Sequence, residues 1–444
     1  MYYFIFYTIL TTIILATTWR YISFEVRKTL LWFYIFYFAS NMLGAIIFGL
    51  AGQISYGFLI DTIIDQYIQG EYVTGAYASV YWLLLFSPFL ILPLVCLRSK
   101  YKLKIDLPAL RFKSALPPFI FCVVILIAVM LAEIAFTHSW GILTLQNLSN
   151  SKEDYTDYII GRGDVYASMS NRFFGYLYMT VPFFAHIAVY HGIIKTSHTL
   201  TWRILAAILI VFIALISIGI NQKSPLILFL ISILVGVSLI KKLSVKFFIL
   251  VPVIVIGIVN FLQVFIQGSD GWSILLSVFH TLFRAPASLP FYVNYFPEHL
   301  PFVGIDFGIL ETLHIPATIA TDNIQMHSIM WGQYFEKFGI TGSVAAPFQY
   351  RAYAQAGLFF ALSNVVLVGL FICFFGWLYK KKILGDAAVS HAFFAQSLIV
   401  LYYLSQTHIR DCIWSSYGIV WVIHGYLLYF ILRKLTAKKI YTLN

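Results

Sequence analysis

The chain has 444 residues, of which 61% are hydrophobic and only 11% are charged, and its formal net charge is +11. This composition excludes a soluble globular domain, because apolar runs of about 20 residues recur along the whole chain and each is long enough to cross a bilayer as a helix. We therefore predict a polytopic helical membrane protein.

About eleven such runs follow one another along the chain. Their backbones must be helical, because the hydrocarbon core of a bilayer offers no hydrogen-bond partners. The first run has no positive leading region and no small-residue cleavage site, so we interpret it as a retained helix. We predict an all-α transmembrane helical bundle in which residues 1–444 form a single integral membrane domain. The expected spans are 2–19, 30–50, 77–97, 115–136, 173–194, 203–220, 225–240, 247–267, 354–379, 388–406 and 414–432.

The Lys and Arg residues sort onto alternate loops of this arrangement. Of the 29, 21 fall on the face that is reached after each odd-numbered span. The positive-inside rule makes that face cytoplasmic, with the N-terminus outside and the C-terminus inside. Topology and anionic inner-leaflet lipids account for the basic balance, so we expect membrane lipids and no nucleic acid as partners.

The loops on the outer face are the long ones, at 51–76, 137–172 and 268–353. The last of these is rich in aromatic residues and is interrupted by several prolines. This mixture favours short helices packed on the bundle, because a disordered linker would be polar and poor in aromatics. We expect the function on the outer side.

Four outer arginines, Arg172, Arg284, Arg351 and Arg410, lie where predicted helix ends meet the outer interface. Burying a guanidinium costs several kcal/mol unless an anion matches it. The alternative is that each arginine pairs with a carboxylate of the chain or snorkels toward lipid headgroups. Guanidinium suits bidentate contact with phosphate, so the group predicts a phosphorylated lipid ligand.

Lys223 stands in the polar hairpin GINQKSPLI between two short apolar runs. A cation there, beside the start of the following helix, suits a diphosphate. The alternative is a snorkelling lysine.

Aromatic residues of the large loop and its flank could stack on sugar faces, although packing is the alternative for each one. These residues are Tyr292, Tyr295, Trp331 and Tyr353.

The layout resembles that of Wzy-type O-antigen and repeat-unit polysaccharide polymerases, including those that extend enterobacterial common antigen. The resemblance is densest from about residue 205 to 425. It rests on IGINQKSPLI, on FRAPASLPFYVNYF, on GITGSVAAPFQYRAYAQAGLFFAL entering a span, and on the arginine of THIRD in the last outer turn.

This resemblance implies a glycosyltransferase of the bacterial inner membrane whose active site faces the periplasm. Such an enzyme transfers a growing glycan from undecaprenyl diphosphate to the non-reducing end of a new lipid-linked repeat unit. The expected partners are undecaprenyl-diphosphate-linked oligosaccharides, membrane lipids and a chain-length regulator protein.

The chemistry needs neutralisation of the leaving diphosphate and one general base for the attacking hydroxyl. Candidates for the base are His408, Glu336, Asp306, His327 and Asp411. We expect no cofactor and no metal, since no DxD-type or CxxC ligand spacing occurs in the sequence. His408 and Arg410 share one short turn, so a base and a diphosphate-binding residue would lie close together there.

Two other functions remain open. One is an O-antigen ligase or another lipid-dependent glycosyltransferase of the GT-C type, for which Asp61 and Asp65 in the first outer loop would supply the acid. The alternative is that Asp61 and Asp65 are a pair of solvated carboxylates, one helical turn apart, without a catalytic role. The other function is a transporter of lipid-linked oligosaccharide, which would favour two related halves and charges deep in its spans.

Overall fold

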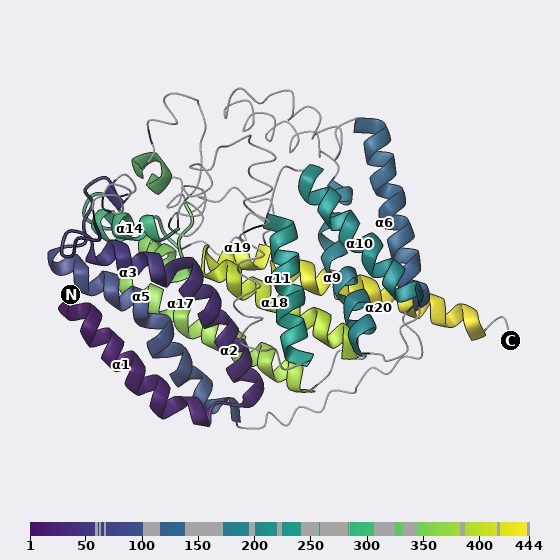
Figure 1. Cartoon of the computed structure of the whole chain (residues 1–444), viewed down its shortest axis with the longest axis horizontal. Coiled ribbons are helices and arrows are strands. Elements are labelled where there is room, and N and C mark those ends of the chain that lie inside the picture. The colour runs from purple at the N-terminus through teal and green to yellow at the C-terminus, as the bar shows by residue number, and fades with distance from the viewer. Residues whose placement is uncertain are drawn as a thin grey trace. The chain divides into compact units, whose positions relative to one another are not determined.

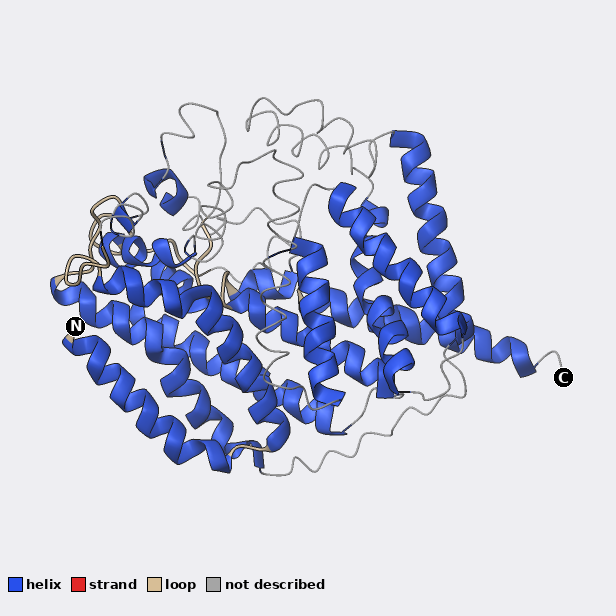
Figure 2. Cartoon of the chain, in the orientation of Figure 1, coloured by secondary structure: helices blue, strands red, loops and turns tan. Residues whose placement is uncertain are grey.

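A computed structural model describes residues 1–57, 61, 64–65, 68–100, 116–137, 172–194, 200–219, 224–240, 257, 283, 285–305, 325–330, 332, 344–381, 387–414 and 418–441. Every regular element in these ranges is a helix, as Figure 2 shows. The predicted all-α class is therefore confirmed for the described part of the chain.

Four helices of the described part are long and apolar enough to cross a membrane. They are Tyr2–Tyr21, Phe24–Leu50, Gly75–Cys96 and Phe348–Tyr379. Several shorter apolar helices accompany them, so the chain is a multi-pass membrane protein. Each predicted span coincides with a helix except 247–267, which lies almost entirely outside the described residues.

Internal contacts group the chain into two compact units. The first comprises residues 1–106, 279–381 and 400–415, and the second comprises 107–278, 382–399 and 416–444.

The first unit is built on α1 (Tyr2–Thr18), α2 (Phe24–Tyr37), α5 (Gly75–Cys96) and α17 (Phe348–Lys381). In Figure 1, α5 lies against α1 and α17, and α17 lies against α2. Gly376 of α17 allows the close approach to α2, because a Cβ at this position would lie 2.6 Å from Cγ2 of Val26 and 3.1 Å from its Cα.

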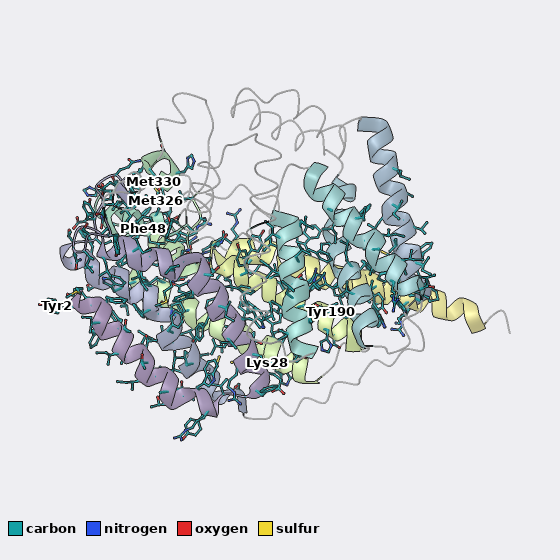
Figure 3. The ribbon with its side chains drawn as sticks, in the orientation of Figure 1. Tyr2, Lys28, Phe48, Tyr190, Met326 and Met330 are labelled. Atoms are coloured by element: carbon teal, nitrogen blue, oxygen red, sulfur yellow. The ribbon has the colours of Figure 1, made fainter. Side chains whose placement is uncertain are left out.

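Short elements gather at one end of this bundle. A π-helical turn, η2 (Phe38–Met42), links α2 to α3 (Leu43–Leu50), and α14 (Leu289–Tyr295) contacts α3, α5 and α17. Phe48, Met326 and Met330, whose side chains are labelled in Figure 3, are at most 1% exposed. Short helices are predicted within residues 268–353, and the described part of this segment includes α14 and the helical segment 325–330.

Pro88 shapes the contact between α5 and α17. A proline has no backbone N–H, so the carbonyl of Leu84, one turn earlier, loses its usual helical donor. The hydroxyl of Ser87 donates to this carbonyl over 2.8 Å, and Nε2 of Gln349 on α17 donates to it over 3.3 Å. Polar side chains thus satisfy a carbonyl inside a span, where lipid could not.

The helix α17 is broken near its beginning. Ala356 (φ −152°, ψ 24°) and Gly357 (φ 81°, ψ −171°) are non-helical, so residues 348–355 form a short helix before the long one. The predicted span 354–379 starts two residues before this break and leaves out most of the short helix. The left-handed φ at residue 357 is accessible to glycine without steric cost, which explains how the chain turns there.

The second unit contains α6 (Leu116–Thr137), α9 (Arg172–Ile194), α10 (Leu200–Gly219), α11 (Ser224–Ile240) and α20 (Ile419–Tyr441). Residues up to 399 of α18 (Ala387–Leu404) also belong to it. The α9 helix contacts α6, α10, α11 and α20, and its Tyr190, labelled in Figure 3, donates a hydrogen bond to the carbonyl of Ser232 on α11.

Candidate functional site

Arg351 lies in the first turn of α17 and is 5% exposed. Its Nη1 donates a hydrogen bond of 3.0 Å to Oγ1 of Thr407. The backbone N–H of Ala346 also donates to the carbonyl of Gln406 over 3.0 Å. These two bonds join the start of α17 to the turn that follows α18.

That turn carries two of the predicted site residues, His408 and Arg410. His408 is 2% exposed, and its Nδ1 accepts the backbone N–H of Arg410 at 3.1 Å. The imidazole thereby caps the short helix α19 (Ile409–Trp414), which starts at the next residue. Its Nδ1 is the acceptor in this bond, so any proton of a neutral ring is on Nε2.

The segment just after Arg284 reaches the same region. The hydroxyl of Ser288 lies 2.8 Å from the carbonyl of Ala285 and 2.9 Å from the carbonyl of Ala345. Hydrogen bonds therefore join the segment that follows Arg284 to the start of α17, and the start of α17 to the turn before Arg410, although Arg284 itself lies outside the described residues.

The turn after α18 is anchored to η2 by Asn41, a residue that the sequence pattern did not predict to be part of the site. In the π-helical turn, Nδ2 of Asn41 donates to the carbonyl of Ser405 and, over 2.8 Å, to the hydroxyl of Ser40. The hydroxyls of Ser40 and Ser405 lie 2.9 Å apart. Asn41 is fully buried, and the signal that could have revealed it is an amide in the middle of an apolar run.

Two buried glutamines lie on the short helix before the break. Nε2 of Gln349 donates to the hydroxyl of Tyr37 and to the carbonyl of Leu84. Gln355 is 1% exposed, and neither of its amide atoms has a hydrogen-bond partner among the described residues. The site therefore contains a guanidinium, an imidazole and an unpartnered amide on adjoining segments.

The predicted sugar-stacking residues are mostly buried. Tyr292 is fully buried and stacks on Phe296, while Tyr353 is 7% exposed and donates its hydroxyl to the carbonyl of Phe296 over 3.0 Å. Tyr295 is half-buried and donates to Glu71 over 3.2 Å. Burial and the nearby Glu71 carboxylate raise the pKa of Tyr295.

Asp61 and Asp65 have partners within their own loop. Asp61 accepts from the hydroxyl of Ser55 over 2.6 Å and from the N–H of Tyr56 over 3.0 Å, and both bonds lower its pKa. Asp65 accepts the hydroxyl of Tyr72 over 2.6 Å. Both carboxylates contribute to holding the loop between α3 and α5 in its conformation.

The remaining predicted residues divide into two groups. Arg172 is the first residue of α9, Asp411 belongs to α19, and His327 is half-buried in the helical segment 325–330. Lys223, Asp306, Trp331 and Glu336 lie outside the described residues. Within the part of the chain that the structure describes, no three His, Cys, Asp or Glu side chains are grouped so as to hold a metal ion.

Comparisons of the chain with protein-family models, curated proteins and solved structures give no match.

Proposed function

We propose that this multi-pass membrane protein is a repeat-unit polysaccharide polymerase of the bacterial inner membrane. The observation that carries the proposal is the pair of hydrogen bonds that join the Arg351 segment to the turn of His408 and Arg410. In a chain built of apolar helices, cationic groups brought together at helix ends suit the charged head of a lipid-linked substrate.

The proposed topology has about eleven spans, with the N-terminus outside and the C-terminus inside. In this topology the start of α17 and the turn after α18 both belong to the outer face. The diphosphate of an undecaprenyl carrier lies at the same depth, just above the hydrocarbon core. Support for this topology comes from the distribution of the Lys and Arg residues over alternate loops.

The reaction transfers a glycan from its diphosphate carrier to the non-reducing sugar of a second lipid-linked unit. A hydroxyl of that sugar attacks the anomeric carbon of the donor, and the bond from this carbon to the diphosphate oxygen breaks. The arginines stabilise the charge that develops on the departing undecaprenyl diphosphate. The hydroxyl proton passes to a general base, for which we propose the carboxylate of Glu336 or Asp306, because Nδ1 of the neutral His408 ring accepts the Arg410 N–H and Nε2 already carries the ring proton.

The test uses purified protein in proteoliposomes supplied with synthetic lipid-linked repeat units. A polymerase produces a ladder of longer lipid-linked glycans, and Arg410→Ala should abolish the ladder, while the exposed control Arg20→Ala should retain it. Absence of the ladder from the wild-type protein would refute the proposal.

The same assay separates the alternatives. A ligase produces a single transfer to a different acceptor lipid, and a transporter moves the substrate across the bilayer without lengthening it. The GT-C alternative requires a carboxylate of the first outer loop, so Asp61→Asn or Asp65→Asn would abolish transfer in that case. Our proposal expects both variants to keep the ladder.

A further inference from the structure

The side chain of Gln355 has no role in the reaction as proposed above. Its amide is 1% exposed, and neither Nε2 nor Oε1 is hydrogen-bonded among the described residues. Buried side-chain amides in folded proteins nearly always have such a partner, and an exception calls for an explanation by a bound group or an ordered water. Gln355 is therefore a candidate for contact with a ligand.

Arg351 precedes Gln355 by one helical turn. Residues four apart in a helix lie on the same face, with Cβ atoms about 5–6 Å from one another. Both side chains are buried, and the helix breaks immediately afterwards at Ala356 and Gly357. The guanidinium and the amide therefore come from one face of a short helix that ends just after the second of them.

Gln349, on the same short helix, provides the contrast. Its Nε2 donates to the hydroxyl of Tyr37 and to the carbonyl of Leu84, although its Oε1 has no partner among the described residues. Gln349 thus connects α17 to α2 and α5 and has a structural role. The amide of Gln355 makes no comparable bond to any described residue.

We propose that Arg351 and Gln355 together bind a glycosyl phosphate. A guanidinium only donates hydrogen bonds and suits phosphate oxygens, whereas an amide both donates and accepts and suits a hydroxyl or an acetamido group. In a glycosyl phosphate, the carbon next to the phosphate-bearing carbon carries such a group. One ligand can thus contact two side chains that are one helical turn apart.

This inference rests on the proposed function and narrows its substrate. Arg351 contacts the phosphate that is attached directly to the first sugar, and Gln355 contacts the neighbouring substituent of that sugar. The protein should then distinguish a sugar-bearing lipid diphosphate from the bare lipid diphosphate that leaves after transfer.

The segment 301–305 covers the end of the short helix. The N–H groups of Val303 and Gly304 donate to the carbonyls of Ala354 and Gln355 over 3.1 and 3.0 Å. The ring of Phe302, which is 42% exposed, would lie 3.2 Å from a Cβ at Gly357. Displacement of this segment would uncover the helix end at Gln355 by breaking those two backbone bonds.

The test compares the binding of farnesyl diphosphate with that of farnesyl diphosphate linked to N-acetylglucosamine, by calorimetry on the purified full-length protein. Wild type should bind the sugar-bearing lipid more tightly. Gln355→Met should weaken binding of this lipid by about tenfold, which corresponds to the loss of one or two hydrogen bonds. The affinity for farnesyl diphosphate should not change. Arg351→Lys should weaken both.

Gln349→Met is the matched control, since it removes an amide of the same size from the same short helix. Its melting temperature should fall, because the carbonyl of Leu84 and the hydroxyl of Tyr37 each lose a partner. Gln355→Met should keep or raise the melting temperature of the unliganded protein. If it fails to fold, Gln355→Asn, which withdraws the amide by one methylene, should show the same loss of preference for the sugar.

The two proposals can fail separately. If Gln355→Met and Gln355→Asn keep the wild-type preference for the sugar-bearing lipid, the amide bonds at most to an ordered water and this inference is overturned, while the proposed function stands. If the wild-type protein binds neither lipid, the proposed function fails and this inference fails with it.

Discussion

Nη1 of Arg351 donates a hydrogen bond to Oγ1 of Thr407 over 3.0 Å, although 56 positions separate the two residues in the chain. This bond fixes the guanidinium at the turn that carries His408 and Arg410. The geometry of the proposed site therefore depends on two segments, one at the start of α17 and the other after the end of α18.

Arg351→Lys keeps the positive charge and removes the planar fork of the guanidinium. We expect the initial rate of ladder formation to fall about 100-fold, because an ammonium cannot hold both Thr407 and a phosphate in the same geometry. The rate in proteoliposomes measures this effect. Arg20→Lys, which changes an exposed arginine in the same way, should retain the wild-type rate, and equal rates for both variants would contradict the proposed role of Arg351.

Asn41→Leu removes the amide that anchors the turn at Ser405. We expect the free energy of unfolding to fall by about 1–3 kcal/mol, because the buried carbonyl of Ser405 loses its donor. The rate of transfer should fall as well, since His408 and Arg410 follow in the same turn. Thermal unfolding and the ladder assay measure the two effects.

The control for this change is Asn364→Leu on α17. Among the described residues, Nδ2 of Asn364 donates to the carbonyl of Phe360 in its own helix and to no other group, so this variant should unfold within about 1 kcal/mol of wild type and transfer at the wild-type rate. Equal stabilities and equal transfer rates of the two variants would refute the anchoring role of Asn41.

The thiols of Cys96 on α5 and Cys373 on α17 lie 3.5 Å apart. We expect diamide, which accepts two electrons and two protons and becomes the hydrazine, to join them as a disulfide. Mass spectrometry after alkylation in denaturant should find the linked peptide. Cys122 and Cys412 should remain free to react, and full alkylation of Cys96 and Cys373 after oxidation would refute the packing of α5 against α17.

The carboxyl group of Asp61 has a lowered pKa, because the Ser55 hydroxyl and the Tyr56 N–H both bond to its charged form. Its contribution to the stability of the loop between α3 and α5 is present above the ordinary value of 3.8 and is lost as the pH falls through the lowered folded-state pKa. Ser55→Ala should raise the Asp61 pKa toward that ordinary value.

The pKa of Asp61 can be read from the carboxyl carbon signals of protein labelled with ¹³C at aspartate. Ser79→Ala, which removes a hydroxyl that donates to the carbonyl of Ala76 in its own helix, should leave the titration of Asp61 unchanged. A titration curve of Asp61 that is identical in wild type and Ser55→Ala would show that the Ser55 bond does not form in solution.

The sequence by itself determined the all-α class of the described part of the chain and the positions of most of its long helices. Hydrophobic run length is a local property, because a segment with no hydrogen-bond partners in lipid must be helical whatever surrounds it. The runs therefore located α1, α5 and α9 to within a few residues. The clustering of cations also drew attention to Arg351 and Arg410 before any contact was known.

Only the tertiary structure decided which of these segments meet. The bonds from Arg351 to Thr407 and from Asn41 to Ser405 join residues far apart in the chain, and apolar periodicity carries no information about such pairs. The break at Gly357 was equally hidden, because an apolar run gives no sign of where a helix turns. The amide of Gln355 became informative only once its burial and its missing partner were visible.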